Sequence, residues 1–442
     1  MSVCESWGRY PVVQQQTHPV NWRDEQLNIA GFDSSVLPYG LGRSYGDVCL
    51  NDGGRLLCTR RMNRFMSFDS ETGLLCCESG VSLAEILEFC VPRGWFLAVT
   101  PGTKHVTVGG AIANDVHGKN HHVAGTFGSH VTRFELLRSD GERMVCSPES
   151  KPLFFSATIG GMGLTGLITW AEIQLIPIKN PFFSVHTTKF GHLDEFFELS
   201  ERFEQSHSYT VSWVDCLARG KHLGRGLFMA GNHAGEEAAG RKVPNRSGGI
   251  PVPVDFPEFA LNGLTVRAFN TLYYNRQFRR ESDTTVHYNP FFYPLDALQG
   301  WNRIYGKRGF LQYQCVVPHD DAAPIRGILE RIARSGQGSF LAVLKVMGKV
   351  KSPGQMSFPK PGVTLALDFP IRGESTFQLF RELDDVVRGA GGRLYSAKDA
   401  CMSAADYQAY YPQWENFSRF IDPAFSSSFW RRVMGTVEGV PS

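Results

Sequence analysis

Three histidines, a lysine and an Asn-Asp pair crowd into one stretch that begins with two glycines. Residues 109–122 read GGAIANDVHGKNHH. Such residues are typical of a metal centre, a catalytic histidine, or a loop around a large anionic cofactor. His117 and His121 have the spacing of zinc ligands on a helix, but Gly118 interrupts the helix and the HExxH glutamate is missing. No metal site is therefore predicted.

A second glycine loop precedes this stretch. Residues 38–47 read PYGLGRSYGD, so Gly40, Gly42 and Gly46 bracket Arg43. A loop of this kind can point successive backbone N–H groups at a phosphate. A plain glycine-rich turn explains the same residues equally well.

A third glycine cluster imitates a dinucleotide fingerprint. Residues 161–166, GMGLTG, match GxGxxG. A Rossmann site requires a helix after the motif, but the β-branched run 167–178 predicts a strand. The glycines still indicate a close backbone approach. Three glycine loops, at 40–46, 102–110 and 160–166, without a Rossmann helix predict a large cofactor threaded through the N-terminal part of the chain.

The elements around these loops are short. Ser82 and Glu85 form a capping-box pattern, which predicts a helix that ends at Gly94. Residues 99–115 are interpreted as strand fragments broken by glycine. Residues 168–178 predict a strand, and the nearby prolines mark a boundary.

The middle of the chain predicts helices packed on a sheet. Strands are expected at 310–317, 340–346 and 363–369, and helices at 194–205, around 325–332 and at 376–388. Residues 219–249 are rich in glycine and basic residues and lack apolar periodicity. They are interpreted as a long mobile loop, which is expected to be functional because of its length.

Two of these strands alternate polar with apolar residues. Gln312 and Gln314 share one strand face. Thr364, Ala366 and Asp368 share a face of another strand. These faces line either a sugar pocket or solvent.

The length, net charge and cysteine content limit the possible classes of protein. The 442 residues suit two domains, and a net charge of +2 argues against nucleic acid as a partner. Ten cysteines without a CxxC pair indicate a reducing compartment. Neither a secretory signal nor a membrane-spanning run is recognised. The chain is expected in the cytoplasm, and peripheral attachment at the inner membrane stays open.

Several motifs together resemble the vanillyl-alcohol-oxidase-type FAD enzymes, and within them the enzymes that oxidise a polyprenylphosphoryl-ribose. The motifs are PYGLGRSYGD, TPGTKHVTVGGAIANDVHGKNHH, GGMGLTGLI, FYPLD, WNRIYG, GFLQYQ, VTLALDFPI and GRLYSAKD, and they cover nearly the whole chain. The resemblance implies an α+β fold. A PCMH-type FAD-binding domain would span 1–178, and an α+β substrate domain with an antiparallel sheet would span 179–392. The segment 393–442 would pack back on the FAD domain.

The resemblance also implies the site. FAD is expected to be bound non-covalently, because Arg43 stands where many relatives carry the histidine that attaches the flavin. Lys398, Tyr45 and His117 are implied as catalytic residues. The implied FAD contacts are Pro38, Tyr39, Gly40, Leu41, Gly42, Arg43, Ser44, Tyr45, Gly46, Asp47, Val48, Gly102, Thr107, Val108, Gly109, Gly110, His117, Gly118, Lys119, Asn120, Ile168 and Tyr395. The implied substrate contacts are Tyr293, Gln312, Gln314, Lys345, Thr364, Ala366 and Lys398.

The implied reaction oxidises the 2-hydroxyl of a polyprenylphosphoryl-β-D-ribose to a 2-keto sugar, the first half of an epimerisation to arabinose for an envelope or surface glycan. A short-chain ketoreductase would complete it, and quinone or oxygen would reoxidise FAD. Lys345 and the basic segment 219–249 would meet the phosphate. That segment, with 251–260, either docks on a membrane or is a flexible loop in solvent.

Some positions depart from the family, and two other functions compete. Certain members carry cysteine where this chain has Ala366 and asparagine where it has Thr364, so inhibition through that thiol is not expected. The rival functions are an FAD-dependent oxidase of a soluble sugar alcohol or aldonolactone, and a non-catalytic or metal-binding protein that has lost its flavin.

Overall fold

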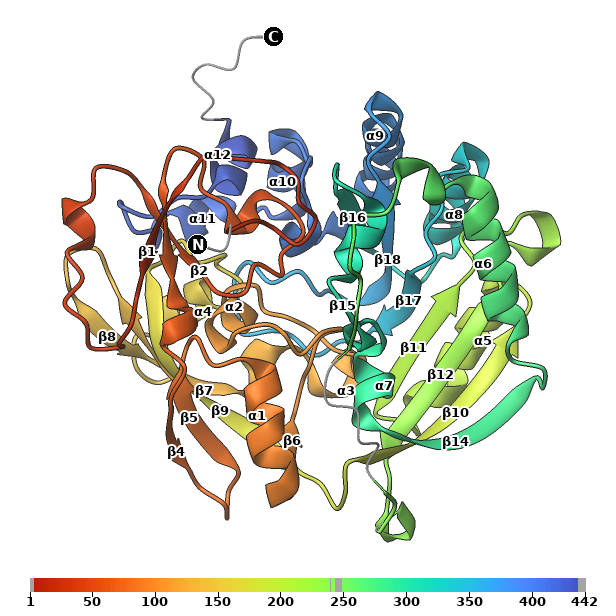
Figure 1. Cartoon of the computed structure of the whole chain (residues 1–442), viewed down its shortest axis with the longest axis horizontal. Coiled ribbons are helices and arrows are strands. Elements are labelled where there is room, and N and C mark those ends of the chain that lie inside the picture. The colour runs from red at the N-terminus through yellow and green to blue at the C-terminus, as the bar shows by residue number, and fades with distance from the viewer. Residues whose placement is uncertain (1–3, 239, 243–248, 436–442) are drawn as a thin grey trace.

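Two large β-sheets lie side by side in the computed structural model, which describes residues 4–238, 240–242 and 249–435 (Figure 1). Two small parallel sheets accompany them. One has the order β1-β3-β2, and the other pairs β13 with β15. Their strands are β1 (Gln16–Pro19), β2 (Val36–Tyr39), β3 (Arg55–Cys58), β13 (Ile250–Pro251) and β15 (Leu298–Gln299).

The N-terminal sheet has the order β4-β5-β9-β7-β8, and β6 pairs with β9. Its strands are β4 (Phe65–Phe68), β5 (Leu74–Glu78), β6 (Trp95–Leu97), β7 (Val131–Leu137), β8 (Arg143–Cys146) and β9 (Leu167–Pro177). The strand β9 starts directly after Gly166. The GxGxxG match therefore opens a strand, as the sequence predicted.

Short helices connect the strands of this half. They are α1 (Leu83–Cys90), α2 (Val108–Ala113), α3 (His121–Ala124) and α4 (Pro152–Thr158). The capping box is confirmed, because the Ser82 hydroxyl accepts from the Glu85 amide and the Glu85 carboxylate accepts from the Ser82 amide. A 3-10 turn follows α1, and Gly94 ends it in the left-handed conformation, with φ of 80°.

One expectation in this half is wrong. Residues 108–113 form the helix α2, although the glycines were interpreted as breaking a strand. The glycine at 109 is required by packing, since a Cβ there would lie 3.0 Å from the Cβ of Ser79. The side chain of Thr107 accepts from the Gly110 amide and caps the helix.

The second sheet is antiparallel throughout, with the order β14-β10-β12-β11-β17-β18-β16-β19. Its strands are β10 (Phe182–Phe190), β11 (Tyr209–Val214), β12 (Gly226–His233), β14 (Glu281–His287), β16 (Phe310–Val317), β17 (Ala342–Met347), β18 (Gly362–Pro370) and β19 (Arg393–Leu394). The predicted strand at 340–346 is β17 and begins two residues later.

Helices cover one face of this sheet (Figure 1). Leucine, isoleucine and phenylalanine side chains of α5 (Leu193–Glu204), α8 (Ala323–Ser335) and α9 (Glu374–Gly389) share a core with apolar positions of the strands. The three predicted helices are therefore confirmed. Further helices are α6 (Gly263–Asn275) and α7 (Tyr288–Phe292).

The interpretation of 219–249 as a mobile loop is wrong for residues 226–233. It contains the strand β12, which lies inside the sheet between β10 and β11. Gly226 and Gly231 allow close packing there: a Cβ at 226 would lie 2.2 Å from the Trp213 carbonyl oxygen, and one at 231 would lie 2.8 Å from the Phe291 ring. Residues 239 and 243–248 of this segment lie outside the described residues.

The C-terminal helices return to the N-terminal half (Figure 1, blue). They are α10 (Ala404–Tyr410), α11 (Trp414–Ser418) and α12 (Ser428–Met434). Phe425 forms an isolated parallel bridge with Val36, and α12 contacts the 3-10 helix Asp47–Cys49. Across the described ranges, the helices all fall short of the length and apolar character needed to cross a bilayer.

Candidate active site

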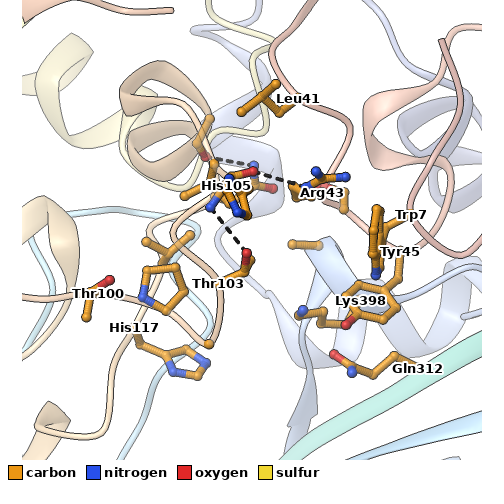
Figure 2. A pocket seen from close by; sticks show the side chains of 18 of the residues that line it. Trp7, Leu41, Arg43, Tyr45, Thr100, Thr103, His105, His117, Gln312 and Lys398 are labelled. Carbon is orange, nitrogen blue, oxygen red and sulfur yellow. Dashed lines mark hydrogen bonds between the residues drawn. The ribbon is translucent and has the colours of Figure 1, made fainter. Parts of the chain in front are cut away.

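A cavity of about 590 Å³ lies where the N-terminal glycine loops meet the strands β11, β16, β17 and β18 of the second sheet. Its wall takes residues from both halves of the molecule. Figure 2 shows Tyr45, Lys398 and Gln312 gathered on one side and His117 on another. The solvent-facing alternative for the strand positions is wrong, because Gln312, Gln314 and Thr364 are all less than 10% exposed.

Most of the candidate residues line this one cavity. They are Pro38, Tyr39, Gly40, Leu41, Gly42, Arg43, Ser44, Tyr45, Val48, Gly102, Thr107, Gly109, Gly110, His117, Gly118, Lys119, Ile168, Gln312, Gln314, Lys345, Thr364, Ala366, Tyr395 and Lys398. Residues as far apart in sequence as Pro38 and Lys398, which are separated by 360 positions, are thus brought together by the fold. Their individual roles stay proposals.

Five candidates lie behind the wall. Asp47 forms ion pairs with Arg432, and Gly46 packs against the Asp399 carbonyl. Val108 is in the core, and the Asn120 amide donates to the Ala98 carbonyl. The Tyr293 hydroxyl is 2.6 Å from Thr100 Oγ1. These residues therefore have partners within the protein, and their contacts with FAD or substrate stay proposals.

The loop 38–48 presents unused donors to the cavity. The backbone amides of Leu41, Gly42, Arg43 and Ser44 donate to no atom of the described residues. Ser79 Oγ and Asn114 Oδ1, from residues on the same wall, are buried and also lack partners there. Buried polar groups are normally satisfied, so this arrangement fits an anionic, polar ligand such as the pyrophosphate of FAD.

The glycines of this wall leave no room for side chains. A Cβ at Gly40 would lie 2.3 Å from Thr107 Oγ1, so the first loop and the start of α2 are in close contact. Arg43 stays in the loop by two contacts: its Nε donates to the His105 carbonyl at 3.1 Å (Figure 2), and its guanidinium lies 4.1 Å from the centre of the Trp7 ring. The backbone of the loop is thereby held against the cavity.

Lys398 has an apolar and partly acidic environment. Its Nζ lies 3.8 Å from the centre of the Tyr45 ring. Burial lowers the pKa of the ammonium group to about 7, and the negative charge of Asp368 opposes the shift. Asp368 lies behind the wall, where it accepts from the Gln312 amide at 2.5 Å. Its own pKa is raised by burial. A neutral amine at this position is able to accept a proton.

His117 belongs to a second polar group. Its Nδ1 lies 2.8 Å from Lys345 Nζ, and its Nε2 lies 3.1 Å from the Gln314 side-chain nitrogen. Lys345 also donates to the Gly118 carbonyl. Burial, followed by the charge of Lys345, lowers the pKa of His117 well below its usual value. The imidazole is therefore neutral near pH 7 and can relay a proton without carrying charge.

Several wall residues were missed by sequence reasoning. They include Trp7, Ser79, Asn114, Trp213, Met229 and Tyr273. No pattern in the sequence marks Trp7 or Tyr273, since their place depends on how distant segments pack. A signal did exist for Gly163 and Gly166, which are on the wall and were interpreted only as a close backbone approach.

Arg432 links the C-terminal helix α12 to the site by ion pairs, and its replacement should lower the stability of the fold. It contacts Asp47 and Asp399, each at 2.8 Å. Replacing Arg432 with methionine leaves two buried carboxylates unpaired, so unfolding free energy should fall by about 3 to 5 kcal/mol. Urea denaturation measures the change. Arg334→Met, which breaks an exposed pair with Glu330, should cost less than about 1 kcal/mol. Equal losses in both variants would contradict the assignment.

The fold and the site together define an FAD-binding oxidoreductase, because a glycine-lined anion site adjoins a buried polar sheet face. A family model described as an FAD binding domain matches residues 28–147. The chain is 38% identical over 418 residues to decaprenylphosphoryl-β-D-ribose oxidase of Mycolicibacterium smegmatis, which covers 90% of this chain and 89% of the relative. It therefore belongs to the decaprenylphosphoryl-β-D-ribose oxidase family of FAD-dependent oxidases.

Two other relatives show how much of the chain is similar to known proteins. An uncharacterised protein of Streptomyces coelicolor is 34% identical over 371 residues, which is 80% of this chain and all of that protein. L-gulonolactone oxidase of Bos taurus is 28% identical over 221 residues, which is 48% of this chain and 49% of that enzyme. Similarity to the lactone oxidase is thus partial, whereas the first two relatives match both halves.

Proposed function

We propose that this protein oxidises the 2-hydroxyl of a polyprenylphosphoryl-β-D-ribose to the 2-keto sugar. The observation that carries the proposal is the single cavity in which the FAD loops face Lys398, Gln312 and Lys345. The identity to decaprenylphosphoryl-β-D-ribose oxidase supports the choice of substrate. When bound, FAD supplies the hydride acceptor for the oxidation.

The charges on the cavity wall favour a phosphorylated sugar over a neutral one. Lys345 is buried on the wall, and Lys119 and Lys398 are half-buried there. Desolvation lowers the pKa of each to about 7. A phosphate monoanion or diester beside them would restore their positive charge and accept charge-assisted hydrogen bonds. A soluble sugar alcohol or aldonolactone offers no such anion.

The polar side chains of the cavity are assigned to proton transfer, to orientation of the sugar and to contact with the phosphate. The neutral amine of Lys398 takes the proton of the hydroxyl, and the Tyr45 ring, whose centre lies 3.8 Å from the amine nitrogen, fixes its position. His117 is the alternative acceptor and is oriented by Lys345. Gln312, Gln314, Thr364 and Ala366 face the same space and orient the sugar ring. Phosphate contact is assigned to Lys345, because it lines the cavity. In the described part of 219–249, Met229 lines the cavity but no lysine or arginine does.

The proposed roles of the residues divide the chain into three regions. FAD binding belongs to residues 1–178 and substrate binding to 179–392. The segment 393–442 carries Lys398 and packs back toward the first region. This proposal is supported by the change of sheet between β9 and β10 and by the contacts of α12.

The reaction also requires partners. A ketoreductase of the short-chain type would reduce the 2-keto sugar and complete the epimerisation to arabinose. Quinone or oxygen would accept the electrons from reduced FAD. The lipid substrate would be met at the cytoplasmic surface of the inner membrane.

An anaerobic visible spectrum tests the function. Purified, FAD-loaded protein is titrated with a short-chain prenylphosphoryl-ribose without oxygen, and bleaching of the flavin bands is expected. Bands that stay oxidised with this substrate but bleach with xylitol or gulonolactone would replace the proposal by the soluble-substrate alternative. Failure to hold FAD after reconstitution would remove the oxidase function altogether.

Lys345→Met should separate phosphate binding from chemistry. Loss of one charge-assisted contact is expected to raise KM for the phosphorylated substrate about tenfold to a hundredfold, with a smaller effect on kcat. Steady-state kinetics with the phosphorylated substrate and with a ribose glycoside that lacks phosphate measures the difference. An equal rise in KM for both compounds would assign Lys345 to the sugar or to His117 instead.

A further inference from the structure

The segment 250–278 exposes apolar side chains to an unusual degree. Eight of the sixteen large apolar residues that are exposed in the described part of the chain fall within it. They are Ile250, Val254, Phe256, Phe259, Leu264, Phe269, Leu272 and Phe278. Scattered exposed apolar residues are ordinary, but such a concentration in one segment marks an interaction surface.

The helix α6 organises part of this segment. Leu264, Ala268 and Leu272 recur every fourth residue, so they form one stripe along the helix. Leu264 is 78% exposed and Leu272 is 74% exposed. The opposite side is anchored, because Val266 is in the core and the Asn270 amide donates to Asp215 at 3.0 Å. The stripe is therefore presented to the outside by a helix that is fixed from behind.

Charge indicates what the stripe contacts. Residues 250–280 contain four arginines against one aspartate and one glutamate. Asp255 is paired with Arg9 and Arg303, which lie outside this segment. Arg267 and Arg279 form no ion pair with any residue that the structure describes. An apolar helix face beside unpaired arginines is the pattern of a helix that lies in the interface of an anionic bilayer, with apolar groups among the acyl chains and cations at the phosphates.

The surface adjoins the mouth of the cavity. Tyr273 of α6 lines the cavity, where its ring lies 4.6 Å from that of Trp213, and Phe269 stacks on Tyr273 at 5.7 Å. On the other side, Ile250 pairs with Leu298, which is also on the wall. A lipid that enters beside α6 would thus reach the polar sheet face without crossing open water.

We infer that the exposed face of α6 and the segment 250–259, here called the entrance surface, dock this protein on an anionic phospholipid bilayer. The bilayer delivers the lipid tail of the substrate to the cavity. The inference deepens the proposed function and rests on it for the identity of that substrate. Docking itself needs only the surface and the bilayer.

Vesicle co-sedimentation tests the inference with the FAD-loaded, full-length protein. The vesicles are phosphatidylcholine with or without phosphatidylglycerol. Wild type should sediment with the anionic vesicles, and L264E/L272E should bind at least about tenfold more weakly. The matched control is Leu153→Glu, a leucine in α4 that is 66% exposed and outside the surface. It should bind as wild type does. R267Q/R279Q should lose the preference for phosphatidylglycerol.

The outcomes separate docking from catalysis. Neither Leu264 nor Leu272 lines the cavity. The flavin of L264E/L272E should therefore bleach with a water-soluble short-chain substrate as fast as the flavin of the wild type. Vesicle binding that is equal in wild type and L264E/L272E, or absent in wild type, would overturn the inference. Vesicle binding without any bleaching by the prenyl substrate would instead overturn the proposed function and leave the docking surface standing.

Discussion

Replacing Lys398 with methionine is expected to lower kcat/KM for the prenylphosphoryl-ribose by about a thousandfold while FAD stays bound. The physical reason is the loss of the proposed base, a wall amine that lies 3.8 Å from the centre of the Tyr45 ring. Methionine fills a similar volume, so the cavity should keep its shape. Single-turnover bleaching measures the rate, and the visible spectrum of the variant measures its FAD content.

The pH dependence tells whether Lys398 acts as a base. Burial lowers its pKa to about 7, and only the neutral amine can accept a proton. The rate should therefore rise as pH increases through 7 and level off above it. Lys398→Arg should not rescue activity, because a guanidinium stays protonated at these pH values. An active arginine variant would show that the positive charge, and not the base, is what the reaction uses.

Asp368 offers a check on the same group. Its charge raises the pKa of Lys398, so Asp368→Asn should move the rising part of the pH profile to lower pH. The amide can keep a hydrogen bond with Gln312. An unchanged profile would mean that another group, such as His117, controls the pH dependence.

Gly46→Ala is expected to remove FAD binding and most of the activity. A Cβ at this position would lie 1.8 Å from the Asp399 carbonyl oxygen and 2.8 Å from the Ala400 Cβ. Backbone atoms cannot move aside as a flexible side chain can, so the first FAD loop and the Lys398 segment must separate. The two are normally joined by a hydrogen bond from the Tyr45 amide to the Ala397 carbonyl at 3.0 Å.

The effect of Gly46→Ala should appear in two measurements. Overpacking should lower the unfolding free energy by about 3 kcal/mol, and the ratio of flavin to protein absorbance should fall sharply. If excess FAD restores the flavin, the rate should stay about a hundredfold low, since Lys398 is displaced. Gly389→Ala is the control, because a Cβ there meets nothing within 4 Å. Full occupancy and full rate in the Gly46 variant would contradict the packing argument.

Local chemistry made some elements predictable. The capping box at Ser82 fixes the start of α1 because both hydrogen bonds lie within four residues. Helices with a regular apolar stripe, such as α8, were found for the same reason. By contrast, glycine was misleading at Gly226, Gly231 and Gly109. A glycine that makes room for a neighbouring ring or backbone looks the same in a sequence as one that ends an element.

The sequence by itself determined the glycine loops, the alternating polar strand faces and the motifs that resemble the FAD oxidases, because each depends on neighbours in the chain. Only the tertiary structure decided which of these side chains meet. It paired Asp47 with Arg432 and Tyr293 with Thr100, added Trp7 and Tyr273 to the cavity wall, and placed an exposed apolar helix at the entrance. The lowered pKa of Lys398 has the same origin, since desolvation is a property of the folded cavity and not of any stretch of residues.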